Sequence, residues 1–282
     1  MSCHFIVKEW FGRLCNNLTQ ITHAYHLAEK THSKLLLPAH AALNAAALVQ
    51  LSDFSKGRPL DAMVEDNFFF TDHPLFEQFP IDQERRRSIL RTILPVLIDN
   101  YLSRLSDRVP DHDVPDLVIH IRSGDVFQRI TDPTLYATPN FVQPPLSFYR
   151  SIIREGDFKS IQIVAEDNRN PCIGALLDQD KRISYRKQKP LEDISTLLAA
   201  KHLVIGYGTF AYVWALASYR LNTLYTQQIP AAVFGSVCNG DLKDVRICTY
   251  TIRNYIQNGD WSCSSEQLEL MLNHSGGDVS RL

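Results

Sequence analysis

The chain has 282 residues, of which 29 are basic and 31 acidic, and 45% are hydrophobic. This composition is typical of a soluble folded protein and excludes disordered, fibrous and membrane-spanning classes. With a net charge of −2, the chain lacks the excess of basic residues that binding to nucleic acids or anionic membranes requires, so neither is an expected partner. The longest apolar stretch, residues 41–51, is shorter than the roughly 20 residues that span a bilayer.

The first residues and the cysteines of the chain indicate in which cellular compartment the protein is expected. The first nine residues contain no basic segment followed by a long apolar run, so we expect no secretory signal. The six cysteines are dispersed without a C-x-x-C pair, which favours free buried thiols over a disulfide set or a zinc site. We therefore expect a cytosolic protein, the alternative being a lumenal catalytic domain trimmed of its membrane anchor.

The first forty residues have the pattern of a β-α-β unit. Apolar runs at 3–7 and 34–38 flank a loop with Gly12 and a stretch, 16–30, whose apolar residues recur at three-to-four spacing. That spacing predicts a helix with one buried face.

Two more helices are expected in this half of the chain, over 38–51 and 82–105. The second carries Arg85, Arg86 and Arg87, which we place on a solvated face. The aromatic block 67–70 fits either a strand or a core loop, and its phenylalanines are candidates for stacking on an acceptor sugar, although burial is the commoner fate of such residues.

A proline-rich segment, 108–115, lacks apolar periodicity and predicts a linker between two domains. Beyond it, apolar runs alternate with helical patterns, which is typical of a mostly parallel sheet covered on both faces. The expected strands are 117–121, 161–165, 202–206 and 224–227, with a weaker one at 182–185, and the expected helices are 146–155, 171–178, 191–199 and 209–219. We predict domains at 1–110 and 116–262 and a tail, 263–282, with an amphipathic piece at 266–272 and a frayed Gly-Gly end.

The residues directly after these strands are the candidate site, because ligands of open parallel sheets bind at the carboxyl ends of the strands. Arginine and glycine occur together in two of these loops, and two loops lead straight into a helix whose free N–H groups favour an anion. Arginine binds phosphate oxygens in pairs. Jointly the loops predict a site for a nucleotide diphosphate; they are 12–17, 120–125, 166–168 and 206–210.

The same loops resemble the motifs of the α1,2- and α1,6-fucosyltransferase and protein O-fucosyltransferase superfamily. Gly12-Arg13-Leu14-Cys15-Asn16-Asn17 is similar to its Gly-Arg-Leu-Gly-Asn-Gln motif, and His120-Ile121-Arg122-Ser123-Gly124-Asp125 to its His-x-Arg-Arg-Gly-Asp motif. The block from Leu191 to Gly208-Thr209-Phe210 resembles the one that ends in Ser-Thr-Phe, and Tyr149 falls at a family tyrosine. The motifs cover about a fifth of the chain.

This resemblance implies an α/β protein of the GT-B fold, with two Rossmann-like domains facing each other across a cleft. It also implies an inverting glycosyltransferase that moves fucose from GDP-fucose to a hydroxyl of a glycan acceptor, with no metal and no cofactor besides the donor. The implied catalytic residues are Arg122, Arg13 and Asp125, and the implied donor-binding residues are Gly12, Asn16, His120, Glu166, Asp167, Gly208, Thr209 and Phe210.

The individual roles follow from the same resemblance. Arg122 is expected to bind the diphosphate, and Arg13 and Asn16 to reach the donor from the first domain. Glu166 and Asp167 are expected to accept hydrogen bonds from guanine N–H groups. The base that deprotonates the acceptor is open between Asp125 and Glu9, either of which is alternatively structural.

Three positions differ from the family motifs: Ser123 replaces the second arginine, Cys15 a glycine, and Gly208 a serine. They leave open another nucleotide-linked deoxysugar as donor, or a sugar-nucleotide-binding protein without turnover. A metal-dependent alternative would use Asp111-His112-Asp113, but this Asp-x-Asp lies in the linker with no strand before it, so we interpret it as a solvated connector. His23 and His26 share a helix face without a third ligand and are interpreted as core or surface residues.

Overall fold

The computed structural model of the chain describes residues 3–57, 62–98, 114–128, 139–228 and 242–282. These residues fall into two compact units, the first within 3–98 and the second within 114–282. Most of the expected linker lies outside the described residues, so its bounds stay a prediction. The Asp-x-Asp sequence at 111–113 and Cys238 also lie outside them.

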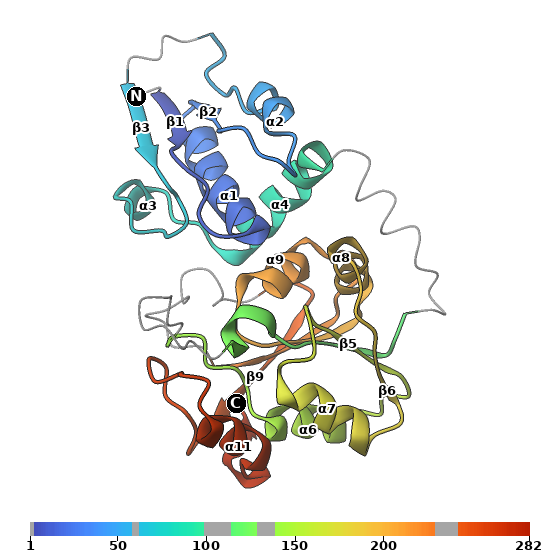
Figure 1. Cartoon of the computed structure of the whole chain (residues 1–282). Helices are drawn as coiled ribbons and strands as arrows, with labels where there is room; N and C mark the ends of the chain where they lie inside the picture. The colour runs from blue at the N-terminus through green and yellow to red at the C-terminus, as the bar shows by residue number, and fades with distance from the viewer. Residues whose placement is uncertain (1–2, 58–61, 99–113, 129–138, 229–241) are drawn as a thin grey trace. The chain divides into compact units, whose positions relative to one another are not determined.

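The first unit is built on a parallel sheet of order β2-β1-β3 among its described residues (Figure 1). Its elements are β1 (Cys3–Val7), α1 (Leu14–Lys30), β2 (Lys34–Leu36), α2 (Ala45–Leu51), β3 (Ala62–Asp66), α3 (Leu75–Gln78) and α4 (Gln83–Leu97). The predicted β-α-β unit is confirmed, with β1 central and α1 buried along its apolar face.

Two predictions about this unit are wrong. The helix expected over 38–51 begins only at Ala45, because the side chain of Asn44 accepts a hydrogen bond from the backbone N–H of Ala47 and caps it there. The arginine triplet does not form a solvated face, since Arg86 and Arg87 are buried. The guanidinium of Arg86 donates through Nε to Nε2 of His23 at 3.1 Å, and Arg85 pairs with Glu29 of α1.

The aromatic block 67–70 forms a loop after β3 rather than a strand. Phe68 and Phe69 are buried in the core, whereas Phe70 is exposed and its ring lies near that of Phe11. Burial, the commoner fate of such residues, holds for two of the three phenylalanines.

The second unit contains a seven-stranded sheet among its described residues, of order β10-β9-β8-β7-β4-β5-β6, parallel except for the β9–β10 pair. Its elements are β4 (Leu117–His120), a 3-10 turn η2 (Gly124–Phe127), α6 (Leu146–Glu155), β5 (Ile161–Val164), α7 (Pro171–Gln179), β6 (Ile183–Tyr185), α8 (Pro190–Ala199), β7 (His202–Ile205), α9 (Thr209–Ala217), β8 (Thr223–Gln227), β9 (Arg246–Ile252), α11 (Ser265–Asn273), a 3-10 turn η3 (Gly276–Asp278) and β10 (Val279–Arg281).

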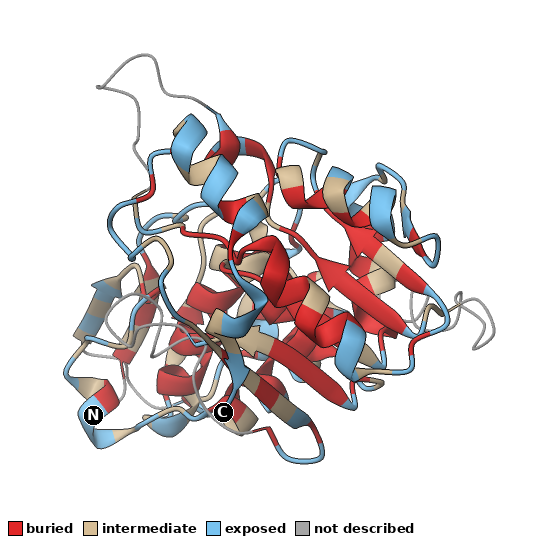
Figure 2. Ribbon diagram, turned by 90° about the horizontal axis from the view of Figure 1, so that it is seen from below, coloured by how far each residue is buried: buried red, intermediate tan, exposed pale blue. Residues whose placement is uncertain are grey.

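Helices cover both faces of this sheet, as predicted. Figure 1 shows α8 and α9 on one side and α6, α7 and α11 on the other. Strands β4, β5 and β7 are almost wholly buried, and Figure 2 shows the buried residues concentrated in the strands and on the inner sides of the helices. The α/β class with parallel sheets is therefore confirmed.

The carboxyl-terminal tail does not fray at its Gly-Gly sequence. Val279–Arg281 pairs antiparallel with β9, and Met271 of α11 is fully buried in the core of the second unit. His274 lies between two other segments, with Nδ1 2.7 Å from the Ser147 hydroxyl and Nε2 2.7 Å from the carbonyl of Arg253. The tail is therefore an ordered part of this unit.

Candidate functional site

In the sheet of the second unit, the order in which the chain adds strands reverses at β4, the most buried strand. From β4 the chain moves outward to β5 and β6 on one side, then returns to place β7, β8 and β9 on the other. A reversal of this kind opens a crevice at the carboxyl ends of the two strands that flank it. The loops at that crevice are 120–125 after β4 and 206–209 after β7, two of the loops singled out from the sequence.

The loop after β4 is bound tightly to the loop after β5. The hydroxyl of Ser123 donates to Oδ1 of Asp167 and accepts from the backbone N–H of Asn170 at 3.1 Å. The backbone N–H of Gly124 also donates to Asp167, at 3.1 Å, and the side chain of Asn170 donates to the carbonyl of Arg122 at 3.0 Å. Ser123 is 1% exposed. These bonds fix the backbone that carries Arg122.

Asp167 accepts further bonds from its own loop. Its Oδ1 accepts from the backbone N–H of Arg169, and its Oδ2 lies 3.3 Å from the Arg169 guanidinium. Partial burial alone would raise the pKa of Asp167, but the hydrogen bonds from Ser123 and from the backbone N–H groups hold it below its usual value. Asp167 thus holds the Arg122 loop in place.

The backbone conformation at residue 124 favours glycine. Its φ of +72° is strained for residues with a side chain, and a Cβ there would lie 2.8 Å from the carboxyl carbon of Glu166. The carboxylate of Glu166 therefore lies over the Gly124 backbone, while the residue as a whole is exposed.

Arg122 has donors of two kinds at the crevice. Its Nη2 donates to Oδ1 of Asp125, within the same loop, at 2.7 Å. Its Nε is buried and has no hydrogen-bond partner among the described residues. A buried donor without a partner costs about 1–3 kcal/mol, a cost that an anionic acceptor would remove.

His120 connects the β4 loop to the β7 loop. It is 7% exposed, and its ring lies 5.7 Å from that of Phe210 in the first turn of α9. Burial, reinforced by the charge of Arg122, lowers the pKa of His120 to about 3. His120 is therefore neutral at physiological pH and contributes position rather than charge.

Helix α9 begins directly after the loop that follows β7. Gly208 is the N-cap and offers no side-chain acceptor, and the first turn holds no acidic residue. The neighbouring α7, by contrast, is capped by the side chain of Asn170. The positive end of the α9 dipole and its first N–H groups are thus suited to an external anion.

The predicted residues of the first unit form a cluster of their own after β1. Arg13 is exposed at the N-cap of α1, and Asn16 follows with its amide against Gly12, whose φ is +68°. Gln20 holds the loop, because its amide donates to the carbonyls of Glu9 and Asn67 and accepts from the N–H of Phe11. Glu9 itself is exposed.

The structure therefore brings together His120, Arg122, Asp125, Glu166, Asp167 and Phe210 in the second unit, and Gly12, Arg13 and Asn16 in the first. Sequence reasoning missed the residues that support them, namely Asn170, Gln20 and the hydroxyl of Ser123. For Asn170 a signal existed, since an asparagine directly before a proline is a common start of a helix.

The described residues include neither a metal-binding cluster nor a membrane-spanning helix. No cluster of three or more His, Cys, Asp or Glu side chains is placed to hold a metal ion. No helix within the described ranges has the length and hydropathy needed to cross a membrane. The cysteines in these ranges, Cys3, Cys15, Cys172, Cys248 and Cys263, are free and buried, as expected.

Comparison with known proteins found no matching family model and no matching curated protein. Among solved structures, the chain is similar to POFUT1 in complex with GDP-fucose, with 11% identity, a TM-score of 0.44 and coverage of 80% of this chain and 97% of that one. It is also similar to the E. coli heptosyltransferase WaaC with ADP, with 11% identity, a TM-score of 0.43 and coverage of 96% and 100%. A third is the E. coli ADP-heptose LPS heptosyltransferase II, with 10% identity, a TM-score of 0.38 and coverage of 96% and 98%. Identities and TM-scores this low carry no substrate over to this chain.

Proposed function

We propose that the chain is a nucleotide-sugar glycosyltransferase that transfers fucose from GDP-fucose to a glycan hydroxyl, with inversion and without a metal or other cofactor. The observation that carries the proposal lies at the carboxyl ends of β4 and β7, where the Nε of Arg122 is buried without a hydrogen-bond partner among the described residues and α9 begins with Gly208 as its N-cap. Donors of these two kinds suit a diphosphate. The motif resemblance of the loops supports fucose as the sugar.

In the proposed reaction the acceptor hydroxyl oxygen attacks the anomeric carbon of fucose while the bond from that carbon to the diphosphate oxygen breaks. The electron pair of the broken bond leaves with GDP, and the hydroxyl proton passes to a base. Negative charge grows on the leaving diphosphate, where Arg122 and the N–H groups near Thr209 would stabilise it. Arg13 of the first unit is proposed to add charge to the same leaving group.

Asp125 and Glu9 remain the proposed alternatives for the base. Asp125 already accepts hydrogen bonds from Arg122 and from the N–H of Val126. Glu9 is exposed, with its carbonyl bonded to Gln20. In this scheme the carboxylate forms no covalent bond to the sugar and only accepts the proton of the acceptor hydroxyl.

A second candidate function is binding of the same sugar nucleotide without catalysis of its transfer. Ser123 stands where the related motif has a second arginine, and its hydroxyl is committed to Asp167 and Asn170. A site with one arginine instead of two favours a sugar-nucleotide-binding protein without turnover. Release of GDP from GDP-fucose, followed over hours with a galactoside acceptor present, separates the two functions.

The test of the binding site is calorimetric titration with GDP, UDP and ADP in buffer containing EDTA. GDP is expected to bind best. Arg122→Ala is expected to weaken it by roughly 10- to 100-fold, the usual effect of losing hydrogen bonds to a charged group. Arg182→Ala is the matched control, because Arg182 lies before β6 at the opposite edge of the sheet and pairs with Asp180. Equal GDP affinity in wild type and Arg122→Ala would refute the proposed site.

A further inference from the structure

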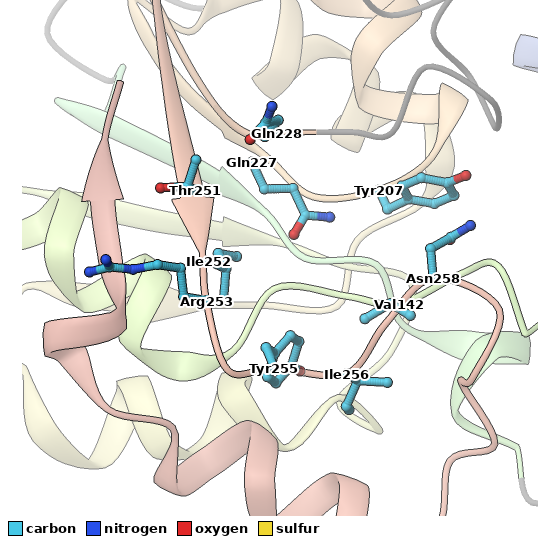
Figure 3. Close-up of a pocket in the computed structure, with 10 residues that line it drawn as sticks. All are labelled: Val142, Tyr207, Gln227, Gln228, Thr251, Ile252, Arg253, Tyr255, Ile256 and Asn258. Carbon is cyan, nitrogen blue, oxygen red and sulfur yellow. The ribbon is translucent and has the colours of Figure 1, made fainter.

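The second unit contains a cavity of about 520 Å³ that the site described above does not use. Figure 3 shows it at the carboxyl ends of β8 and β9, where Gln227 and Ile252 end their strands. Its volume lies within the roughly 300–1,000 Å³ of small-molecule sites. Its described lining consists of Val142, Tyr207, Gln227, Gln228, Thr251, Ile252, Arg253, Tyr255, Ile256 and Asn258.

Two tyrosines of the lining are hydrogen-bonded to one buried residue, Gln143. Gln143 is fully buried, and its amide donates to the carbonyl of Tyr207 at 3.2 Å. The hydroxyl of Tyr255 donates to the carbonyl of Gln143 at 3.0 Å. The rings are braced as well, Tyr207 edge-on to Phe141 at 5.5 Å and Tyr255 edge-on to His274 at 5.2 Å. The walls are therefore formed before any ligand arrives.

The lining combines apolar surface with neutral hydrogen-bonding groups. Val142, Ile252 and Ile256 supply aliphatic surface, and the amides of Gln227, Gln228 and Asn258 can each donate and accept. In Figure 3 the amide of Gln227 points toward the side where Tyr207 and Asn258 lie.

The described lining includes one charged residue. None of the described lining residues is acidic, and the one cation, Arg253, extends away from the others in Figure 3. Its Nη2 donates to the carbonyl of Gly277. A neutral ligand with both hydroxyl groups and an apolar face fits this lining better than a phosphate or a carboxylate does.

We propose that this cavity binds a pyranose ring, either the sugar of the donor or a sugar of the acceptor. The C–H face of a pyranose matches the aliphatic and aromatic walls, and its hydroxyl groups match the three amides. The position fits too, because Tyr207 of the cavity directly precedes Gly208 and Thr209 of the predicted phosphate segment. The identity of the ring as a reactant rests on the proposed function.

The experiment measures saturation transfer to methyl α-L-fucopyranoside and methyl β-D-galactopyranoside by NMR, and calorimetric affinities for GDP and GDP-fucose. The test variant is Gln227→Ala, whose side chain is half-buried at the cavity. The control is Asn222→Ala, an exposed amide at the amino end of β8, on the opposite edge of the sheet.

Loss of one hydrogen-bonding amide is expected to weaken the pyranose about 3- to 10-fold, with Asn222→Ala behaving as wild type. A weaker GDP-fucose complex at unchanged GDP affinity assigns the cavity to the donor sugar. Weaker methyl glycosides at unchanged GDP-fucose affinity assign it to the acceptor.

Two results overturn the proposal: no effect of Gln227→Ala on any of the four probes, or an equal loss for GDP and GDP-fucose, which would make the cavity a nucleotide site. If GDP fails to bind wild type, the proposed function fails, and the methyl glycosides still decide the cavity.

Discussion

Lowering the pH should destabilise the first unit through His23. This ring is fully buried, and its Nε2 accepts from Arg86, so Nδ1 carries the proton and donates to the carbonyl of Phe68 at 2.9 Å. Burial, together with the charge of Arg86, lowers its pKa to about 3. The folded pKa lies below the unfolded one of about 6.5, so the stabilisation is full above pH 6.5 and is lost as the pH falls toward 3.

The size of the effect follows from the two pKa values. Between pH 7 and pH 5 the unfolded chain binds a proton that folded His23 does not, which lowers the free energy of unfolding by ~2 kcal/mol. His26 and His40 in the same unit have lowered pKa values and act in the same direction. In the second unit, the effects of two groups oppose each other. Lowering the pH destabilises the unit through His120, whereas burial raises the pKa of Asp193 to about 6. Protonation of Asp193 between pH 7 and pH 5 therefore raises the free energy of unfolding by about 1 kcal/mol. The first unit is therefore the cleaner test.

The assay is urea unfolding of the full chain at pH 7 and pH 5, followed by circular dichroism, for wild type, His23→Gln and His32→Gln. His32 is exposed and serves as the matched control. Wild type and His32→Gln should lose ~2 kcal/mol more than His23→Gln between the two pH values. A second measurement is the NMR titration of the His23 ring in wild type, which needs no variant. A ring that titrates near pH 6.5 would refute the reasoning.

The remaining predictions concern the second unit. Gly124→Ala should cost about 1–2 kcal/mol for its positive φ alone, whereas Gly174→Ala, in the interior of α7 with open space at its Cβ, should stabilise by roughly 0.5–1 kcal/mol; thermal melts measure both, and equal effects would contradict the strain. Ser123→Ala leaves Asp167 and the N–H of Asn170 each short of a bond and should cost about 1–3 kcal/mol in urea unfolding; an unchanged midpoint would contradict the bracing role. EDTA should leave the release of GDP from GDP-fucose unchanged, and a loss restored by Mg²⁺ or Mn²⁺ would show that a metal rather than arginine neutralises the diphosphate.

The spacing of apolar residues predicts most of the helices and strands, because these elements are buried on one face or on both. Helix α1 and strands β4, β5 and β7 all appear close to their predicted ranges. Strand β9 escaped prediction because Thr249 and Thr251 alternate with buried Cys248 and Tyr250, and this half-buried pattern resembles that of a polar segment. Strand β10 escaped because its stability comes from pairing with β9, a contact distant along the chain.

In the candidate site, too, some residues can be predicted from the sequence and others cannot. The residues proposed to touch a ligand follow strands directly, so Arg122 and Gly208 can be proposed from their positions in the sequence alone. The supporting contacts join loops far apart in sequence, as Ser123 joins Asp167 and His120 joins Phe210, and no local pattern carries that information. The same holds for the buried Arg86, whose charge pattern indicated solvent until its partner His23 was placed.

The most direct test of the account is kcat/KM for the release of GDP from GDP-fucose in wild type, Arg122→Ala and Arg122→Lys, with circular dichroism to verify folding. Because Arg122 is proposed to stabilise the charge that develops on the leaving diphosphate, Arg122→Ala should lose on the order of 100- to 1000-fold. Arg122→Lys keeps the charge and loses the paired donors, so it should recover only part of that loss. Full turnover by a folded Arg122→Ala protein would contradict the account.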